Sequence, residues 1–440
     1  MLYILPNYVN IVLDTLNSNG FEAYIVGGCV RDFLLKRTPH DFDITTNAKP
    51  SEILEVFKNF HTIETGLKHG TITVVVEKVP VEITTYRIDG TYSDGRHPDT
   101  VEYTSNLKDD LSRRDFTINA MAYDKNGNLV DEFLGLNDLN LKLIRCVGNP
   151  KNRFSEDALR IFRAIRFSSQ LNFSIEKDTS YMVHALKDTL KKISVERIAV
   201  ELNKLIMGDN VHDVLLNYSD VISTVIPEIS KCIGFNQHSR YHKYDVWEHI
   251  VVSVEKSPKI LSVRLAMLLH DIGKPETFTL DKNGNGHFYN HAHVGANITE
   301  NILKSLKYDN FTIKRVTSLV YHHDDEFNSK YDVKKALSTL GKDTFFELLN
   351  VQTSDALAKF DFCRARINHI ITVKHMALDI LNNNECISLK DLNINGSDLK
   401  SLGFTGKSIG DNLNLLLDAV MKEKVINEKS KLIEYIKNPI

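Results

Sequence analysis

Cysteine and a strong charge bias are both lacking in this sequence of 440 residues, and each absence excludes a class of protein. The five cysteines are odd in number, lie far apart and form no Cys-x-x-Cys pair, so neither a disulfide framework nor a zinc knuckle is predicted. The formal net charge is only −3, so any surface for nucleic acid must come from local clustering of Lys and Arg. No apolar run approaches the roughly 20 residues that span a bilayer.

The start of the sequence also lacks the features of a signal peptide. The segment MLYILPNYVNIVLDTLNSNGF has neither a basic n-region nor a cleavage site. Its apolar residues instead fall on one face of a helix, and they are Ile4, Val9, Val12, Leu13 and Leu16. We therefore predict no membrane association and expect the cytoplasm as the compartment.

The length and the residue patterns predict several domains of different character. A chain of this size allows about three domains. Three β-rich runs, Ala23–Val26, Thr71–Val76 and Val81–Thr85, predict strands, whereas the pattern is helical from about residue 151 onward. The stretch Asp281–Gly286 predicts a surface loop. We therefore expect an α+β fold with a mixed sheet in a head (1–150), followed by an all-helical neck (151–206), body (207–360) and tail (361–440).

The segment YIVGGCVRDFLLKRTPHDFDITT combines a strand, a double glycine, a helix start and an Asp-x-Asp pair. Gly27 and Gly28 let the backbone approach a phosphate, and Arg31 in the following helix adds a charged fork. Alternation along an extended segment puts Asp41 and Asp43 on one face, where their repulsion favours a bound Mg²⁺. Each motif alone is typical of an ordinary turn or a solvated loop. Together they predict nucleotidyl transfer, in which Mg²⁺ activates a 3′-hydroxyl and binds the triphosphate.

Four segments in this order resemble the class II tRNA nucleotidyltransferase and bacterial poly(A) polymerase family: GGCVRD, DFDIT, TGLKHGTITVVV and LSRRDFTINAMAYD. The resemblance covers residues 22–205. It implies that Asp41 and Asp43 bind the catalytic metal and that Gly28, Arg31 and Arg114 contact the incoming nucleotide.

Three further features near these motifs have open roles. Glu82, on a neighbouring predicted strand, is a candidate third acidic partner. Asp115 either orients the sugar or its neighbouring arginines, or forms a simple salt bridge. The polar segment Arg87–Pro98 resembles the flexible loop of this family that acts when the last adenosine is added.

The segment RFSEDALRIFRAIRF predicts one amphipathic helix with Ser155 as its N-cap. Its polar side could be an ordinary solvated face with ion pairs. A carboxylate and a guanidinium, however, match the exocyclic amine and the ring nitrogen of cytosine and adenine, and both contacts would be reversed for guanine and uracil. Asp157 and Arg160 are therefore candidates for choosing C and A without a template.

The family resemblance adds to this helix and to the segment that follows it. The Glu-Asp-x-x-Arg motif of the family matches Glu156, Asp157 and Arg160. It implies that Arg163 and Arg166 reach the triphosphate or the base. In the later segment KKISVERIAVELNKLI, the resemblance gives Glu196 and Arg197 a structural role.

A second group of residues, between positions 241 and 356, resembles the HD phosphohydrolase superfamily in order and spacing. The resemblance implies one metal on His249, His270, Asp271 and Asp355, a second metal or a phosphate on His291 and His322, and a phosphate contact at Lys274. Imidazole and carboxylate ligands suit Mn²⁺, Fe²⁺, Ni²⁺, Co²⁺ or Mg²⁺. The expected chemistry is that of a phosphatase or cyclic phosphodiesterase, and the alternative is a structural domain.

The sequence as a whole favours an enzyme that builds the 3′ CCA end of tRNA from CTP and ATP, with no protein partner evident. Alternatives within the class are a poly(A) polymerase or an enzyme that adds only A or only CC, and the polar loop argues against the CC-only type. Alternatives from other classes are an HD-type hydrolase with an RNA-binding head, and a non-catalytic RNA-binding protein. The tail segment LGFTGKSIGDNLNLLLDAV resembles the part of the family that grips the tRNA elbow, and it could equally be a C-terminal helical cap.

Overall fold

The computed structural model describes residues 5–39, 41–90, 100–239, 243–359 and 364–437. The chain divides into two compact units, Met1–Pro227 and Glu228–Ile440. Among the described residues, none of the helices combines the length and the apolar character that a membrane crossing requires.

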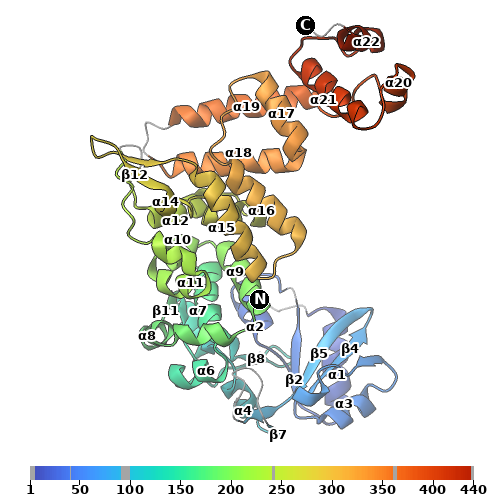
Figure 1. The fold of residues 1–440 in the computed structure, drawn as a ribbon. Coiled ribbons are helices and arrows are strands. Elements are labelled where there is room, and N and C mark those ends of the chain that lie inside the picture. Colours follow the sequence, from blue (N-terminus) through green and yellow to red (C-terminus); the bar gives the residue numbers. More distant parts are fainter. Residues whose placement is uncertain (1–4, 40, 91–99, 240–242, 360–363, 438–440) are drawn as a thin grey trace. The chain divides into compact units, whose positions relative to one another are not determined.

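The N-terminal part of the first unit contains a seven-stranded sheet of order β3-β4-β5-β2-β1-β8-β9, of which Figure 1 labels β2, β4, β5 and β8. Its strands are β1 (Ala23–Val26), β2 (Asp43–Thr46), β3 (His61–Ile63), β4 (Thr71–Val76), β5 (Val79–Thr85), β8 (Ala122–Tyr123) and β9 (Leu129–Val130). β2 runs antiparallel to β1 and parallel to β5, so the sheet is mixed and the expected α+β class is confirmed. The predicted strands match β1 and β4, and β5 begins slightly before its predicted start.

A two-stranded sheet of β6 (Arg87–Asp89) and β7 (Val101–Tyr103) lies between β5 and β8 along the chain. The segment Arg87–Pro98 was expected to contain the flexible loop of the family. Residues 91–99 of this region lie outside the described residues.

Alternation along β1 separates the two faces of the main sheet. Ala23 and Ile25 join an apolar core with helices α1 (Asn7–Ser18), α2 (Gly28–Leu34) and α3 (Pro50–Val56). Val26 faces the other way and packs with Leu111 of helix α4 (Leu107–Ser112). Asp43 is the register partner of Val26, so the acidic start of β2 lies on the face away from α1, α2 and α3.

The remainder of the first unit is mainly helical. It contains α5 (Gly135–Asn140), α6 (Pro150–Glu156), α7 (Leu159–Leu171), α8 (Lys177–Ala185), α9 (Val195–Ile206), α10 (Val211–Asn217) and α11 (Ser219–Val225), with a parallel pair of β10 (Leu143–Ile144) and β11 (Ser174–Ile175). Short 3-10 helices of the first unit cover Leu67–His69, Thr117–Asn119 and Lys187–Lys192, and a further one, Pro227–Lys231, begins at its last residue and continues into the second unit.

The expected single helix around Asp157 is wrong, because the chain forms two helices with a break at this residue. Asp157 has φ −139° and ψ 106°, which is extended backbone. Its Oδ1 accepts the N–H of Leu159 (3.0 Å) and so satisfies the start of α7. Ser155 is not the N-cap, since its hydroxyl donates to the carbonyl of Lys151 inside α6 (2.8 Å).

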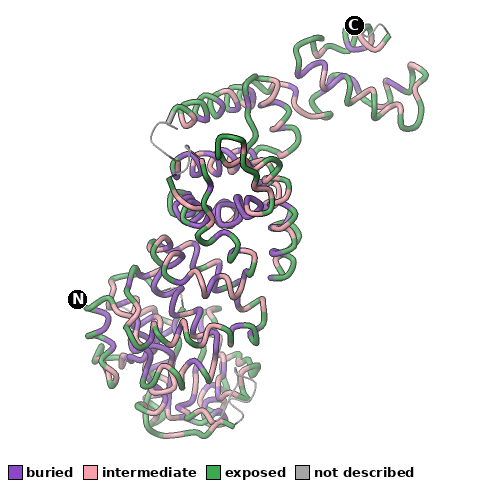
Figure 2. The backbone as a smooth tube through the Cα atoms, turned by 60° about the vertical axis from the view of Figure 1, so that its left-hand side comes forward, coloured by how far each residue is buried: buried purple, intermediate pink, exposed green. Residues whose placement is uncertain are grey.

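In the described part of the second unit, the regular structure is helical apart from one hairpin of β12 (Phe278–Leu280) and β13 (Gly286–Phe288), whose turn is the glycine-rich loop expected from the sequence. Its helices are α12 (Val246–Lys256), α13 (Leu261–Leu269), α14 (Lys274–Thr277), α15 (His291–Ser305), α16 (Asn310–His322), α17 (Lys330–Leu340), α18 (Lys342–Leu357), α19 (Arg364–Asn382), α20 (Gly396–Ser401), α21 (Lys407–Met421) and α22 (Lys429–Lys437). Buried residues run through the interior of each unit (Figure 2), and the last helices have a small core of their own around Leu399, Leu416 and Leu432.

Candidate functional site

Three carboxylates gather where β2 begins. Asp43 is the first residue of β2, and its register partner on β5 is Glu82. The packing around the Asp43 carboxylate raises its pKa, the nearby Arg114 opposes this effect, and the charges of Asp41 and Glu82 raise the pKa further. Oxygen ligands that repel one another in this way fit a hard divalent cation such as Mg²⁺.

The position before α2 requires a glycine, both because of its backbone conformation and because of the side chains around it. Gly27 has φ 83°, in the left-handed region that disfavours any side chain. A Cβ at this position would lie 3.0 Å from Nη1 of Arg114 and 4.0 Å from Oδ2 of Asp43. The backbone can therefore approach the acidic group closely, and Gly28 follows as the first residue of α2.

A cavity of about 680 Å³ opens beside these residues, a size typical of small-molecule sites. It brings together every residue that the sequence analysis assigned to nucleotide or metal binding in the head and neck, namely Gly28, Arg31, Asp41, Asp43, Arg114, Asp157, Arg160, Arg163 and Arg166. Eight arginine or lysine side chains and five aspartates line the cavity, a balance that suits an anionic ligand.

Buried acidic and amide groups hold the arginines of this cavity in place. Nη1 of Arg31 donates to Oδ1 of Asn119 (2.8 Å). Oδ2 of Asp115 accepts from Nε (2.9 Å) and Nη2 (2.6 Å) of Arg163, and its Oδ1 accepts from Asn119 (3.0 Å). Burial alone would raise the pKa of Asp115, but Arg163 and Asn119 hold it well below the usual value. The contact is an ion pair that also fixes the guanidinium of Arg163, so it fits both the arginine-orienting role and the simple salt bridge expected for Asp115.

The two candidate base-selecting residues lie in the same cavity but are bound to different partners. Oδ2 of Asp157 accepts from Nη2 of Arg197 (2.8 Å). The guanidinium of Arg160 donates to Oε2 of Glu156 (2.5 Å) and, through Nη2, to the carbonyl of Arg113 (3.0 Å). Arg197, for which the family resemblance implied only a structural role, contacts Asp157 and lines the cavity.

Arg166 is the most buried of the predicted nucleotide-site arginines. Its Nε donates to Oε2 of Glu201 (2.7 Å) and its Nη1 donates to Oε1 of Gln170 (3.1 Å). Sequence reasoning missed Glu201 on α9. A signal was available, because Arg197, Glu201 and Lys204 follow the spacing of one helix face.

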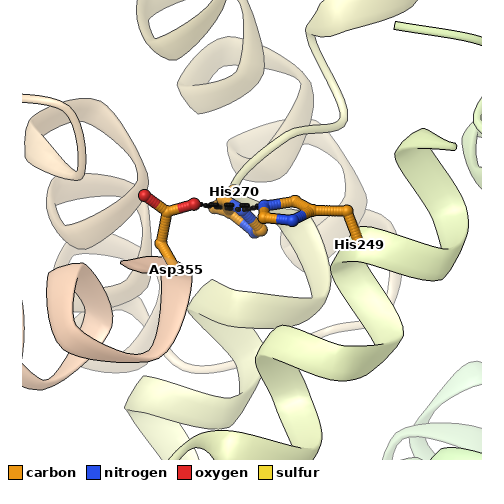
Figure 3. Close-up of side chains that lie close together, drawn as sticks. All are labelled: His249, His270 and Asp355. Carbon is orange, nitrogen blue, oxygen red and sulfur yellow. Dashed lines mark hydrogen bonds and ion pairs between the residues drawn. The ribbon is translucent and has the colours of Figure 1, made fainter. Parts of the chain in front are cut away.

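The second unit holds two adjoining groups of possible metal ligands. The first group is His249 on α12, His270 at the end of α13 and Asp355 on α18 (Figure 3). Nε2 of His249 lies 3.1 Å from Oδ1 of Asp355 and 3.3 Å from Nε2 of His270. All three side chains are buried, and burial lowers the pKa of His249.

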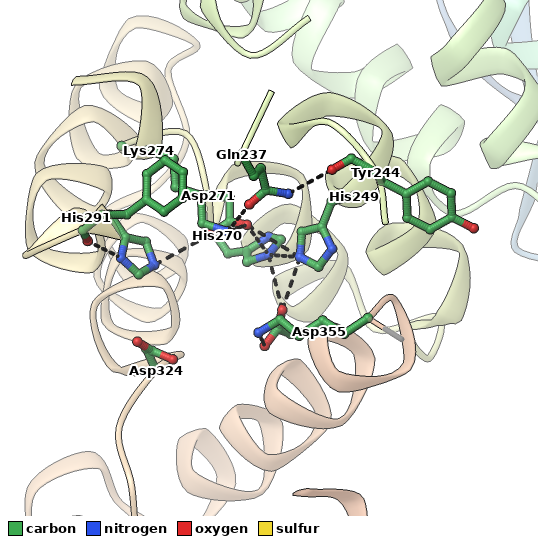
Figure 4. A network of polar contacts seen from close by, with 12 residues as sticks. Gln237, Tyr244, His249, His270, Asp271, Lys274, His291, Asp324 and Asp355 are labelled. Atoms are coloured by element: carbon green, nitrogen blue, oxygen red, sulfur yellow. Dashed lines mark hydrogen bonds and ion pairs between the residues drawn. The ribbon is translucent and has the colours of Figure 1, made fainter. Parts of the chain in front are cut away.

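The second group is Asp271, His291 and His323. In Figure 4, Asp271 lies between His291 of this group and His249 of the first. Oδ2 of Asp271 is 3.4 Å from His249 and 3.3 Å from His270. Oδ1 of the same carboxylate is 3.6 Å from His291 and 3.8 Å from His323. One carboxylate therefore presents one oxygen to each group.

The tautomers of three histidines favour a bound cation. The Nδ1 atoms of His270, His291 and His323 lie 2.8, 2.9 and 2.7 Å from the backbone carbonyls of Met267, Phe288 and Val320. A carbonyl only accepts, so each Nδ1 carries a proton and each neutral ring presents a lone pair at Nε2. Burial and the neighbouring His270 lower the pKa of His323 to about 4. Lone pairs facing each other across 3.2 Å, as in His291 and His323, repel unless a cation lies between them, so the donor set fits divalent metal ions.

The structure corrects one member of the expected ligand set: His323, and not His322, joins the cluster. Nδ1 of His322 lies 2.6 Å from Oδ2 of Asp325, away from the other histidines. The reason is helical rotation, since adjacent side chains point about 100° apart. His323 continues the buried stripe of Val316 and Val320 and is 2% exposed.

Lys274 was expected to contact a phosphate, and the structure places it against the cluster itself. Its Nζ donates to Oδ2 of Asp271 (2.6 Å) and to Oε1 of Gln237 (2.8 Å), and the side chain is buried. A cavity of about 800 Å³ opens beside it and is lined by Asp271, His291, His323 and Asp355 together with Tyr289 and Tyr321, among others.

Three family models match the chain. The "Poly A polymerase head domain" covers residues 23–145, and the "Probable RNA and SrmB- binding site of polymerase A" covers residues 172–232. The model of tRNA nucleotidyltransferase domain 2 covers residues 288–436. These matches, together with the carboxylate cluster of the head and its cavity, define the class of protein as a nucleotidyltransferase.

Relatives of this chain include several CCA-adding enzymes. A CCA-adding enzyme from Ligilactobacillus salivarius is 33% identical over 97% of this chain and 95% of its own length. Another, from Oceanobacillus iheyensis, is 50% identical over 46% of this chain, so the chain spans about half of that relative in this match. The chain belongs to the family of CCA-adding enzymes.

Solved structures of this family have the same fold. The CCA-adding enzyme of Bacillus stearothermophilus, in complex with CTP, has a TM-score of 0.74 at 25% identity over 99% of this chain and 98% of its own. The Thermotoga maritima CCA-adding enzyme, complexed with tRNA, has a TM-score of 0.62 at 20% identity over 99% of this chain and 96% of its own.

Proposed function

We propose that this protein adds C, C and A to the 3′ end of tRNA from CTP and ATP without a template. The observation that carries the proposal is the cavity in which Asp41 and Asp43 meet the arginines of α7 and the carboxylate of Asp157. Relatives bound to CTP and to tRNA add support. In this proposal the tail, residues 361–440, contacts the tRNA.

In the proposed chemistry, some residues of the cavity bind the triphosphate and others select the base. Asp41 and Asp43, with Glu82 as a further acidic partner, would hold Mg²⁺ beside the triphosphate. The bound cation supplies charge neutralisation for the leaving pyrophosphate and lowers the pKa of the attacking 3′-hydroxyl. Arg31 and Arg163 keep N–H groups beyond those used by their protein partners, and these can donate to phosphate oxygens.

Base selection is assigned to Asp157 and Arg160. Oδ1 of Asp157 accepts from Leu159 and Oδ2 accepts from Arg197, and a carboxylate oxygen accepts a second hydrogen bond readily. Nε of Arg160 is not used by the bonds to Glu156 and to the backbone, so the guanidinium retains donor capacity. An exocyclic amine and a ring nitrogen would satisfy both residues, as they occur in cytosine and adenine.

The proposal is tested with labelled tRNA that lacks the CCA end or only its final A, supplied with each nucleotide singly and in pairs. We expect two C residues and one A, followed by arrest. Continued addition of A to arbitrary RNA would favour a poly(A) polymerase, and addition of A only to tRNA ending in CC would favour the A-adding type. The absence of any incorporation would contradict nucleotidyl transfer.

A second function, phosphohydrolysis in the second unit, is favoured by two observations. The histidine Nε2 atoms of the cluster point toward one another, and the Asp271 carboxylate presents one oxygen to each group of ligands. His249, His270 and Asp355 would hold one divalent ion, and His291 with His323 a second. Ions at these positions would supply electrophilic activation of a phosphoester. A tRNA end that carries a 2′,3′-cyclic phosphate is a coherent substrate, since its hydrolysis exposes the hydroxyl that the transferase needs.

The test of this second function is metal-dependent release of phosphate. His270→Ala should abolish it while leaving nucleotide addition largely intact, and the matched variant His322→Ala should preserve it, because His322 lies outside the cluster. Loss of both activities in His270→Ala would indicate a folding role. Release of phosphate that survives in His270→Ala would contradict the assignment.

A further inference from the structure

One aromatic ring in the nucleotide cavity is surrounded by three guanidinium groups. The ring is that of Phe167 on α7, and the Cζ atoms of Arg166, Arg31 and Arg163 lie 3.5, 5.0 and 5.3 Å from its centroid. All four side chains line the cavity that also holds Asp41. Distances of this order allow attraction between a cation and the face of an aromatic ring.

Three cations packed around one ring repel one another, and each is paired with its own acidic side chain. Arg31 pairs with Asp32 (2.8 Å) and Arg166 with Glu201 (2.7 Å). Arg163 pairs with Asp115, as described above. Each of the three positive charges around the ring therefore has a negative partner.

The three arginines come from two separate helices of the first unit. Arg31 belongs to α2 of the head, whereas Arg163 and Arg166 belong to α7, one turn apart in the sequence. Phe167 is contacted by all three, and it is 4% exposed. The ring also packs edge-on against Phe116, at 5.7 Å between centroids and 83° between planes. Phe167 is thus held by the core while the guanidinium groups lie around it.

We propose that Phe167 is a positioning residue for the triphosphate: its ring sets the spacing of the guanidinium groups of Arg31, Arg163 and Arg166. The inference rests on the proposed nucleotidyl transfer. The phosphate chain is common to CTP and ATP, whereas base selection is assigned to Asp157 and Arg160, which bind other partners. A change at Phe167 should therefore weaken the binding of CTP and of ATP equally and leave base selection unchanged.

A purely structural role for Phe167 predicts something different, and α7 supplies a matched control. Phe162 lies on the same helix, is fully buried and is not among the residues that line the cavity. Phe162→Leu and Phe167→Leu remove a ring of the same size from the same helix. Both should lower stability by similar amounts, but only Phe167→Leu should alter the binding of phosphates.

The experiment measures KM and kcat for CTP and ATP on tRNA substrates, together with the affinity for inorganic tripolyphosphate by calorimetry. For Phe167→Leu we expect KM to rise about ten-fold for both nucleotides with kcat within about two-fold, and tripolyphosphate to bind about ten-fold more weakly. Phe162→Leu should match the wild type in all of these. Phe167→Met conserves volume more closely and provides the same test if Phe167→Leu does not fold.

Three outcomes would overturn the inference: unchanged KM and tripolyphosphate affinity in Phe167→Leu, an equal effect of Phe162→Leu, or an effect on one nucleotide only. A wild-type protein that incorporates no nucleotide would contradict the proposed function instead. In that case the comparison of tripolyphosphate affinities still decides the role of Phe167.

Discussion

Replacing Asp115 by asparagine should destabilise the first unit and release Arg163. The carboxylate accepts four hydrogen bonds, two from Arg163, one from Asn119 and one from the N–H of Phe116. An asparagine keeps one oxygen and gains an NH2 group, which must face either Arg163 or the donors on the other side. One set of donors therefore loses its acceptor, and the charge opposite Arg163 disappears.

The size of the effect follows from burial. Removing one member of a buried ion pair costs about 3–5 kcal/mol. The side chain of Asp115 is 10% exposed and that of Arg163 is 33% exposed, so water compensates part of the loss and we expect about 2–3 kcal/mol. The pKa of Asp115 is depressed in the folded protein, so its stabilisation is present above an unfolded pKa of about 3.9 and is lost as the pH falls through the folded pKa.

The assay is urea unfolding followed by circular dichroism between pH 7 and pH 2. The free energy of unfolding should be lower for Asp115→Asn at pH 7, and the difference from the wild type should narrow as the pH falls below about 4. The single tryptophan, Trp247, lies in the second unit and provides an internal control. The urea concentration at which its fluorescence changes should be the same in Asp115→Asn and in the wild type. Equal stability at pH 7, or a difference that stays constant down to pH 2, would refute this account.

Three further predictions concern the two cavities. Gly27→Ala should lower kcat/KM for nucleotide addition by about 10²-fold, since the new Cβ displaces Arg114, and an unchanged rate would show that the close approach is unimportant. His323→Ala should lower the number of metal ions bound per chain by elemental analysis whereas His322→Ala should not, and equal losses would contradict the corrected ligand set. Asp157→Ala should reduce the discrimination against GTP and UTP by about 10²-fold in single-nucleotide incorporation assays, and unchanged discrimination would remove its role in base selection.

The parts of the head that were predictable depend on short-range patterns. The runs Ala23–Val26 and Thr71–Val76 are β-rich and bounded by glycine or charged residues, and they form β1 and β4 as expected. The acidic pair is equally local, because alternation along an extended segment suffices to place Asp41 and Asp43 together. The order and spacing of these motifs also led to the family, which the relatives confirm.

Features that depend on packing between distant elements could not be predicted in the same way. The break at Asp157 arises because its side chain caps α7 and binds Arg197 on α9, 40 positions away in the sequence. The contact of Arg31 with Phe167 joins the head to α7, and no local pattern indicates it.

The choice between His322 and His323 is an intermediate case. The buried stripe of α16, extended by one helical turn from Leu319 and Val320, selects His323, so the information was present in the sequence. Adjacent histidines cannot be distinguished by order and spacing alone, which is why the resemblance pointed to the wrong one.

The most direct test of the account is nucleotide incorporation by Asp43→Asn, compared with the wild type on tRNA that lacks its CCA end. The substitution would keep the shape of the side chain but remove the charge that faces Asp41 and Glu82. We therefore expect a folded protein whose activity is lower than that of the wild type by at least about 10³-fold. Incorporation of C, C and A by the wild type together with this loss is the predicted result. Full incorporation by Asp43→Asn would contradict the assignment of the acidic pair as the centre of nucleotidyl transfer.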